Sequence, residues 1–519
     1  MLRSSLSLFA GIVGFAFAAT TVPAWAQVQA GAGGGAVAGG GAVAGAGGGA
    51  GSGQAGARHR PAAALAPAPF TWLEDSATLG PVVGPLTTQG WWVGKDGLSL
   101  AKLVPSWTSD PTVEVLLFPP VSGHPSKAER FLLQVPTGPA LPPMDERGMV
   151  IGFHPFSVSE KSVFNASGLP QICDARGWYL LAPYGLTDTN MGNVASQDAL
   201  DAILVWLRTN GIAYNEKRVY TAGFSMGGLN AVSYALRHQS PQGPVRIAGV
   251  INHTGTMDVI DQYNVGTLQL QQLLANPDHF GGAPLQSPFA WARVNPIRVQ
   301  GGAAVPASAQ AVNLKDLPIY LHWNSQDPNT NLVQYNRALR DYLLAQGALV
   351  AVNEVQAGPS THAWSSLSMA QAVDFVAQAS EAPAPGDLGG GSAEIFADRL
   401  AAYRMSRVLA IDPSTVARYR LTVGSGGSNA IAVQGARGVR RLELDLEAAG
   451  LTSALALSVT SWTTDFKPLT LVLRGFPNPP SLVLASGVPP LAVAHDPHKG
   501  ELLVTPNATG AFAVIDILP

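Results

Sequence analysis

The sequence predicts an α/β architecture, in which a mainly parallel β-sheet carries helices on both faces, followed by a small antiparallel β domain. Between residues 149 and 380, apolar strand-like runs alternate with segments of helical periodicity, and this alternation is typical of parallel strands joined by helical crossovers. A Pro/Gly-rich joint at 383–391 ends the alternation. Beyond it the chain is strand-like, and Leu442–Leu446 alternates strictly between apolar and acidic residues, as a half-buried strand does.

The helix at 196–210 is the clearest element of the predicted α/β region. Its apolar residues recur at i, i+3, i+4 and i+7 from Leu200, and Ser196 or Asp198 is expected to cap it. An earlier helix at 169–177 is expected to end at Gly177. The remaining expected elements are strands at 113–118, 131–135, 149–153, 178–182, 218–221, 247–251, 319–323, 350–355, 469–473, 482–484 and 512–517, and helices at 258–274, 332–345 and 393–403.

A long excursion separates the expected strand that ends near Ile251 from the one that begins at Pro318. It has helical spacing at 258–274 and is loop-like at 276–300. Insertions above the carboxyl edge of a parallel sheet commonly form the substrate pocket and its lid. We therefore expect this excursion to set substrate specificity.

The N-terminus has the pattern of a secretory signal. Arg3 precedes an apolar run at 6–19, and the small-x-small sequence Ala24-Trp-Ala26 stands before Gln27. The apolar run is too short to span a bilayer comfortably. We expect export, with a mature chain that starts near Gln27 and has no membrane span; an uncleaved anchor is the alternative.

Composition excludes one class of function and one kind of site. Charged residues make up 13% of the chain and its formal net charge is −3, so the clustered basic surface that nucleic-acid binding needs is missing. The single cysteine, Cys173, lies in an apolar-periodic run, and we interpret it as a buried thiol without a catalytic role. No cofactor and no metal are expected. The oligomeric state is left open.

The stretch Gly223-Phe-Ser225-Met-Gly227 is the strongest chemical motif of the sequence. It follows a short β-rich run and precedes a helical segment. In a strand–turn–helix setting, G-x-S-x-G is a nucleophile elbow, which exposes the serine Oγ at a strained turn between small residues. The motif alone is loose, because a Gly-rich turn can be purely structural. Ser225 is therefore the candidate nucleophile, conditional on its partners.

A serine hydroxyl needs a base within hydrogen-bond reach and a carboxylate that orients this base. In elbow-type folds the chain order is Ser, then Asp or Glu, then His. Asp327 follows the expected strand 319–323, and His362 follows the strand 350–355. The carboxyl ends of parallel strands share one edge, so we predict the triad Ser225, Asp327 and His362.

Three other residues compete for these roles. His253 also follows a strand, but it precedes every candidate acid, so we interpret it as a pocket or capping residue. Asp258 and Asp261 stand one loop early for the orienting acid, although some hydrolases place the acid there. Asp327 is preferred over both. An Asp before Pro can also simply begin a turn, and a loop His can simply be solvated.

An oxyanion formed at Ser225 needs preorganised donors. The backbone N–H of Met226, directly after the nucleophile, is one expected donor. The second is expected from the loop after the strand 149–153, which reads His154-Pro155-Phe156-Ser157. Proline has no N–H, so Phe156 is the expected donor and Ser157 the alternative.

These residues resemble the α/β-hydrolase superfamily of serine hydrolases. The likeness is greatest to secreted polyhydroxybutyrate-depolymerase/feruloyl-esterase-like enzymes and to the catalytic domain of prolyl-oligopeptidase-type peptidases, and it covers about 131–380. It implies Ser225 as nucleophile, Asp327 as acid and His362 as base. Two departures are visible: His154-Pro155 replaces the usual His-Gly, and the acid loop at 322–327 is one residue longer than usual. The resemblance is carried by Phe153–Pro155, Gly177–Pro183, Arg218–Gly228, Phe280–Gly282, Asn295-Pro296, Asp327 and Gly358–Trp364.

The leading expectation is a secreted serine esterase that acts on a small-molecule or polymeric ester, with a polyester and a plant-type ester as candidates. A prolyl-oligopeptidase-type peptidase is the first alternative, and a non-catalytic binding protein on a hydrolase scaffold is the second. The expected organisation is a signal peptide at 1–26, a Gly/Ala/Pro-rich disordered linker at 27–69, an N-terminal β-rich segment at 70–130, an α/β-hydrolase catalytic domain at 131–380, a linker at 381–392 and a C-terminal β-rich domain at 393–519.

Overall fold

The computed structural model describes most of the chain after residue 91. The predicted signal at 1–26 and the predicted linker at 27–69 lie outside the described residues, as do 381–390 of the second linker. No helix within the described ranges is long and apolar enough to cross a membrane. These ranges are 92–93, 96–137, 141, 143, 146–239, 244–356, 362–378, 391–403, 405–424, 428–486, 490–506 and 512–519.

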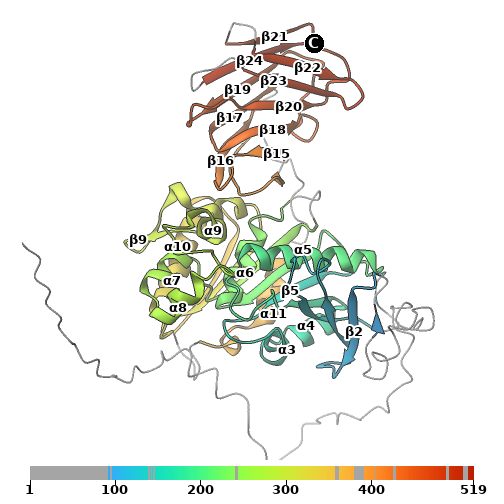
Figure 1. The fold of residues 1–519 in the computed structure, drawn as a ribbon, viewed down its shortest axis with the longest axis vertical. Coiled ribbons are helices and arrows are strands. Elements are labelled where there is room, and N and C mark those ends of the chain that lie inside the picture. Colours follow the sequence, from blue (N-terminus) through green and yellow to red (C-terminus); the bar gives the residue numbers. More distant parts are fainter. Residues whose placement is uncertain are drawn as a thin grey trace, which may run out of the picture. The chain divides into compact units, whose positions relative to one another are not determined.

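A ten-stranded mixed sheet forms the first part of the fold (Figure 1). Neighbouring strands from β6 to β12 run parallel, whereas β1 to β4 and the β4–β6 pair are antiparallel. In spatial order the strands are β1 (Trp92–Val93), β2 (Ser99–Val104), β3 (Thr112–Leu117), β4 (Glu129–Gln134), β6 (Tyr179–Pro183), β5 (Met149–Phe153), β7 (Val219–Phe224), β8 (Ile247–His253), β11 (Ile319–Asn324) and β12 (Val350–Val355).

Residues 70–91 of the predicted N-terminal β-rich segment lie outside the described residues, and the described remainder of the segment is continuous with this sheet. Strands β1 to β3 extend it beyond β4, and the expected boundary at residue 131 falls inside β4. Phe131, Leu132 and Leu133 of β4 are fully buried in the same core as β5 and β7. The segment therefore packs on the α/β core as part of one sheet.

Helices cover the sheet and share its core (Figure 1). Helix α5 begins earlier than expected, and its cap is Asn193, whose side-chain oxygen accepts the N–H of Ser196 at 2.9 Å. The predicted caps Ser196 and Asp198 are thus wrong, because both lie inside the helix. Gly177 ends α4 as predicted, with a φ of 63°. The helices are α3 (Lys161–Ala166), α4 (Leu169–Arg176), α5 (Val194–Thr209), α6 (Met226–Ala235), α10 (Thr330–Ala345) and α11 (Met369–Gln378).

The excursion between β8 and β11 is more ordered than the sequence suggested. Part of the segment expected to be loop-like is helical: a proline in the first turn begins α9, and the helix buries its own residues Trp291 and Val294. An isolated helix this short is marginal in water. Burial of its apolar side chains, and not the periodicity of its sequence, therefore makes this segment helical. The elements are α7 (Val259–Val265), α8 (Leu268–Leu274), α9 (Pro288–Val294), β9 (Val299–Gln300), β10 (Ala303–Ala304) and the 3₁₀ turns η4 (Pro306–Ser308) and η5 (Gln310–Leu314).

The C-terminal β domain consists of two six-stranded sheets with a core of their own. Most strand pairs are antiparallel as predicted, but β17–β19 and β18–β20 are parallel. One sheet has the order β13 (Ser392–Ala397), β16 (Ala417–Val423), β17 (Ala430–Arg437), β19 (Leu457–Thr463), β24 (Phe512–Leu518) and β21 (Leu482–Ala485). The other has the order β14 (Ala402–Tyr403), β15 (Ser406–Ile411), β18 (Val439–Asp445), β20 (Thr470–Arg474), β23 (Glu501–Thr505) and β22 (Ala492–Asp496).

The helix predicted at 393–403 is wrong, because this segment forms β13 and β14. Ile395 and Ala397 belong to the core of the β domain and Ala393 is also buried, which is a spacing of two residues and not of three or four. β13 is the edge strand of its sheet, and pairing with β16 along its whole length satisfies the backbone groups on that side. The prediction failed because that pairing partner lies about 20 residues further along the chain, beyond the reach of local periodicity.

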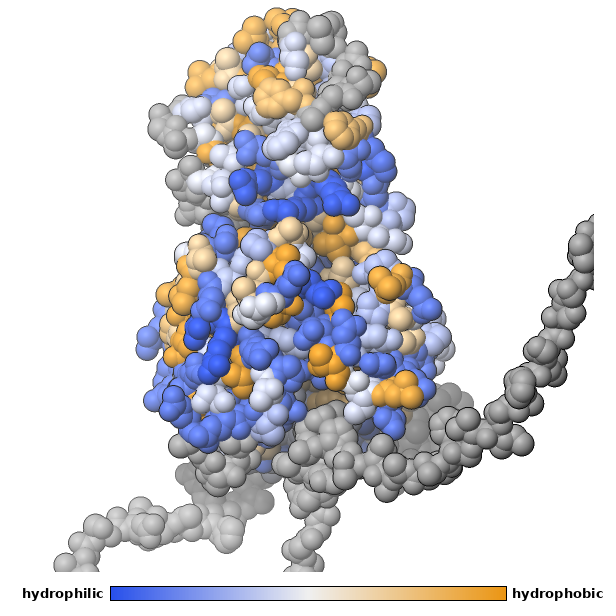
Figure 2. All heavy atoms as spheres, turned by 90° about the vertical axis from the view of Figure 1, so that its left-hand side faces the viewer, coloured by the Kyte–Doolittle hydropathy of each residue, from blue (hydrophilic) through white to orange (hydrophobic). Residues whose placement is uncertain are grey.

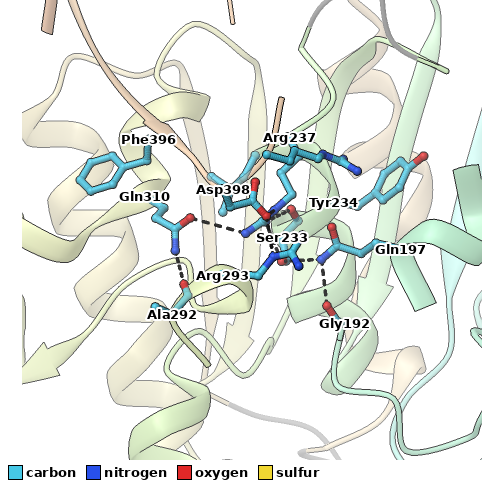
Figure 3. A network of polar contacts seen from close by, with 12 residues as sticks. Gly192, Gln197, Ser233, Tyr234, Arg237, Ala292, Arg293, Gln310, Phe396 and Asp398 are labelled. Carbon is cyan, nitrogen blue, oxygen red and sulfur yellow. Dashed lines mark hydrogen bonds and ion pairs between the residues drawn. The ribbon is translucent and has the colours of Figure 1, made fainter. Parts of the chain in front are cut away.

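Asp398, directly after β13, connects three parts of the chain (Figure 3). Its Oδ2 accepts hydrogen bonds of 2.8 Å from Nε of Arg237, which follows α6, and from Nε of Arg293 in α9. The Arg237 and Asp398 side chains are almost fully buried. Burial opposes ionisation of Asp398, but the surrounding guanidinium groups outweigh it and hold the pKa of this carboxyl below its ordinary value.

Replacing Asp398 by Asn should destabilise the protein strongly. The variant leaves the guanidinium groups of Arg237 and Arg293 without their counter-charge, which costs about 3–5 kcal/mol for a buried pair. Because the folded pKa of Asp398 is lowered, the pairing contributes fully above the unfolded pKa near 4 and is lost as the pH falls below it. Denaturant unfolding of the full chain at pH 7 measures the loss, and the difference from wild type should narrow below about pH 4.

Asp374→Asn is the matched control. Asp374 pairs with Arg176 at the surface, where the two side chains are 51% and 31% exposed, so its loss should cost less than about 1 kcal/mol. Equal losses in the two variants would show that burial of Asp398 has no special consequence.

Candidate active site

Ser225 stands at the turn between β7 and α6, at the carboxyl end of a central strand. Its φ of 57° is unusual for a residue other than glycine, and its N–H donates to the carbonyl of His253 at 2.9 Å. A Cβ at Gly223 would lie 1.9 Å from the carbonyl oxygen of Gly227, and a Cβ at Gly227 would lie 2.1 Å from that of Phe153. Both glycines are therefore sterically required, which is the geometry predicted for the elbow.

His362 bridges Ser225 and Asp327. Its Nδ1 lies 2.6 Å from Oδ2 of Asp327, and its Nε2 lies 3.2 Å from Oγ of Ser225. A carboxylate only accepts hydrogen bonds, so Nδ1 carries the proton and Nε2 accepts from the serine hydroxyl. The structure thus brings together the three residues that the sequence proposed, in the order serine, base and acid.

The carboxylate of Asp327 is held from its other side as well. Its Oδ1 accepts the backbone N–H of Asn329 at 2.8 Å and the side-chain amide of Asn329 at 3.1 Å. The side chain is fully buried, where a fixed carboxylate orients an imidazole more effectively than one in water. The turn after β11 therefore presents Oδ2 to His362 alone.

The rival acids are engaged elsewhere. Asp258 caps α7 through the N–H of Asp261 at 3.0 Å and also accepts the N–H of Val299 at 2.7 Å. The carboxylate of Asp261 accepts the hydroxyl of Tyr335 at 2.6 Å. Neither carboxylate contacts His362, so the geometry favours Asp327 as the orienting acid.

His253 supports the loop that carries the base. Its Nε2 lies 3.0 Å from the carbonyl oxygen of Ala363, the residue after His362, and 3.1 Å from Oγ of Ser366. A carbonyl only accepts, so this nitrogen carries the proton. The ring of Phe224 lies between the two histidines, with centroid distances of 4.5 Å to His253 and 4.6 Å to His362. His253, predicted to be a pocket or capping residue, is thus a buried residue that supports this loop. The spacing of the sequence did not indicate its contact with Ala363.

The loop after β5 contains both residues predicted as candidates for the second oxyanion donor, Phe156 and Ser157. The N–H of Ser157 donates to the carbonyl of Asp188 at 2.8 Å, so this amide is committed to the fold and the alternative donor is disfavoured. Phe156 remains the predicted donor, together with Met226 at the first position of α6. The ring nitrogens of His154 lie 2.9 Å and 3.0 Å from the carbonyl oxygens of Pro155 and Tyr184, and these contacts hold the loop although Pro155 replaces the usual glycine.

A buried glutamate organises the neighbouring turn, and sequence reasoning did not single it out. Glu129 is fully buried and accepts the backbone N–H groups of Tyr184, Gly185 and Leu186 at 2.6–3.0 Å. Burial raises the pKa of Glu129 to about 8, against the opposing effect of these amides. The available signal was an acidic residue two positions before the apolar run Phe131–Leu133. Glu129 acts on the turn that packs against the oxyanion loop.

Comparisons with known proteins find similarity among solved structures. No family model and no curated protein matches the chain. Similar solved structures include FphF, a fluorophosphonate-binding serine hydrolase of Staphylococcus aureus (10% identity, TM-score 0.40, covering 52% of this chain and 99% of that one). Others are a ferulic acid esterase (12%, 0.37, 52% and 98%) and an S-formylglutathione hydrolase from Agrobacterium tumefaciens (11%, 0.39, 54% and 98%).

These neighbours are hydrolases and esterases, the class of enzyme that the sequence resembles. Each likeness spans about half of the chain. At such low identities and TM-scores they carry no argument about this chain's reaction or substrate, so the functional argument rests on the geometry around Ser225.

Acid should destabilise the protein through the two buried histidines behind the site. Burial and the neighbouring His322 and His362 hold the pKa of His253 well below its ordinary value, and burial lowers the pKa of His322 to about 4. Both pKa values are depressed relative to the unfolded chain, so stability is lost as the pH falls below about 6.5. For His322 the loss reaches about 3 kcal/mol at pH 4.

Denaturant unfolding of the full chain between pH 7 and pH 4 measures this dependence. His322→Gln should flatten it, whereas His498→Gln, at an exposed position, should leave it unchanged. An unaltered pH dependence in His322→Gln would contradict the assignment.

Proposed function

We propose that this protein is a secreted serine hydrolase of the α/β-hydrolase type, which cleaves carboxylic esters through an acyl-enzyme on Ser225. The observation that carries the proposal is the bridging position of His362, hydrogen-bonded to Asp327 through Nδ1 and to Ser225 through Nε2. Secretion rests on the signal pattern at 1–26.

In the first half-reaction, Ser225 Oγ attacks the ester carbonyl carbon as His362 Nε2 takes its proton. The carbonyl oxygen becomes an oxyanion, and the amide groups of Met226 and Phe156 are the donors proposed to stabilise it. Collapse of the tetrahedral intermediate breaks the bond to the alcohol, whose oxygen receives the proton from His362. The acyl group stays on Ser225.

In the second half-reaction a water molecule takes the place of the alcohol. His362 removes a proton from this water, which attacks the acyl carbon, and the same proton returns to Oγ of Ser225 when the carboxylic acid leaves. Asp327 stays ionised throughout and stabilises the imidazolium that forms twice in each turnover. Its hydrogen bonds from Asn329 hold the carboxylate in place during both half-reactions.

The fold favours esterase over the peptidase alternative. Peptidases of the prolyl-oligopeptidase type place a large propeller before the hydrolase domain, whereas here β1 to β4 belong to the catalytic sheet itself. A non-catalytic scaffold would not need a serine, a base and an acid that are hydrogen-bonded to one another in a row. A polyester and a feruloylated saccharide are both candidate substrates, and parallel assays with soluble p-nitrophenyl esters, polyester film, feruloylated sugars and peptides would separate them.

Ser225→Ala should abolish covalent labelling by a fluorophosphonate probe and reduce ester turnover on the order of 10⁶-fold, while the protein remains folded. His362→Ala should have an effect of similar size, because the two residues act as a unit. Gel fluorescence measures labelling, and circular dichroism reports the fold. Probe labelling of wild type that persists unchanged in Ser225→Ala would refute the nucleophile.

Asp327→Asn should leave a folded enzyme whose turnover is reduced on the order of 10⁴-fold, because the amide no longer selects the productive tautomer of His362. Asp261→Asn is the matched control: it removes a carboxylate from the neighbouring rival position, whose partner is Tyr335, and should retain turnover within about tenfold of wild type. If the two variants exchanged these phenotypes in steady-state assays, the acid would have to be reassigned.

A further inference from the structure

The outer face of the sheet that begins with β13 carries an unusual set of side chains. Along β16 and β17 the residues that point inward, such as Leu421 and Val433, fill the core of the β domain. Their neighbours point away from it, and the register sets Arg418 beside Arg437 and Arg420 beside Gln434. This face therefore presents guanidinium and amide groups in a row.

Two aromatic rings lie further along the same sheet. Trp462 of β19 and Phe512 of β24 are direct register partners, and they are 42% and 60% exposed. Large exposed aromatic side chains on adjacent strands are costly to hydrate and mark sites of interaction on soluble proteins. Together with the row of guanidinium and amide groups, these two rings form a surface that is partly polar and partly aromatic.

Several hydrogen-bonding groups on this face have no polar partner among the described residues. Arg437 makes no ion pair, and neither the amide of Gln434 nor the indole N–H of Trp462 makes a hydrogen bond, within that part of the chain. Arg418 and Arg420, by contrast, share the carboxylate of Glu394. The guanidinium group of Arg437 and the amide of Gln434 are therefore available as planar donors close to the indole ring of Trp462.

These side chains line one cleft of about 720 Å³, whose other wall includes Phe289 of α9. Three arginines and one glutamate line it, so its local charge is positive although the chain as a whole has a formal net charge of −3. On the face drawn in Figure 2, strongly hydrophilic residues form a band with hydrophobic residues next to it. A ligand that fits such a cleft is anionic, offers hydroxyl groups and has flat apolar faces.

We propose that this cleft binds an acidic polysaccharide, a chain of sugars that carry carboxylate groups. A pyranose ring stacks its C–H face on Trp462, a uronate carboxylate pairs with Arg437, and ring hydroxyls bond to Gln434. An uncharged polyester would leave the guanidinium groups desolvated without compensation. Stacking and charge pairing together thus select a carboxylated sugar chain over a neutral polymer.

The inference is independent of ester hydrolysis at Ser225, because none of the proposed contacts involves the triad. Each activity can fail without the other. If both hold, the β domain retains the protein on an acidic polysaccharide while the catalytic domain acts on esters nearby.

Affinity electrophoresis of the full chain in gels that contain polygalacturonate or alginate tests the proposal, with unsubstituted xylan and hydroxyethylcellulose as neutral polymers. Wild type should be retarded by the acidic polymers only, and retardation should weaken as salt is added. Trp462→Ala and Arg437→Gln should each weaken binding about tenfold or more. Phe466→Ala and Arg407→Gln, which replace an exposed aromatic and an exposed arginine outside the cleft, should bind as wild type does.

Circular dichroism and denaturant unfolding of the same preparations report that all four variants are folded, and their soluble-ester turnover should match that of wild type. Equal retardation by neutral polymers would overturn the proposal, as would no retardation by either acidic polymer. Binding of polyphosphate as tight as that of polygalacturonate would reduce the cleft to a general anion site. If Arg437→Gln lost binding and Trp462→Ala did not, the cleft would likewise be only a general anion site, because Trp462 would then make no stacking contact with the sugar.

Discussion

The close approach of three backbone segments at the end of β7 is the constraint on which the rest of the site depends. Gly223 and Gly227 touch across the elbow, and Gly227 also touches the end of β5 at Phe153, at distances that no Cβ could occupy. This packing fixes the left-handed conformation of Ser225 and sets the start of α6 beside the loop after β5. The nucleophile and both proposed oxyanion donors are consequently positioned by a single steric contact.

Around this contact, buried polar groups fix the loops and turns that carry the proposed catalytic residues. His362, the proposed base, lies on a loop, and loops are the most variable parts of a fold; here the loop is anchored by the imidazole of His253 through the carbonyl of Ala363. Asp327, the proposed acid, is fixed by Asn329, and the turn beside the proposed oxyanion loop is fixed by Glu129. Each support satisfies backbone donors or acceptors that would otherwise be buried without partners.

The two folded regions are linked by charge as well as by the chain. Asp398 of the β domain accepts from Arg237, just beyond the helix that follows the nucleophile, and from Arg293 of the insertion. A buried carboxylate between two guanidinium groups tolerates little displacement, because separation would leave uncompensated charges. The same β domain exposes Trp462 and Arg437 on its outer sheet face. The domain thus combines a buried attachment with an exposed surface suited to a ligand.

The sequence by itself determined the elbow, the alternation of strands and helices and the order of Ser225, Asp327 and His362, because steric rules and periodicity act over a few residues. It failed where the deciding partner is distant in the chain: β13 is a strand because β16 pairs with it, and α9 is ordered because its apolar face is buried. Only the tertiary structure shows that Asp327, which the sequence already favoured, contacts His362 and that the Ser157 amide donates to Asp188. Hydrogen bonds between segments that are distant in the chain leave no local pattern in the sequence. They can therefore be identified only in the folded structure.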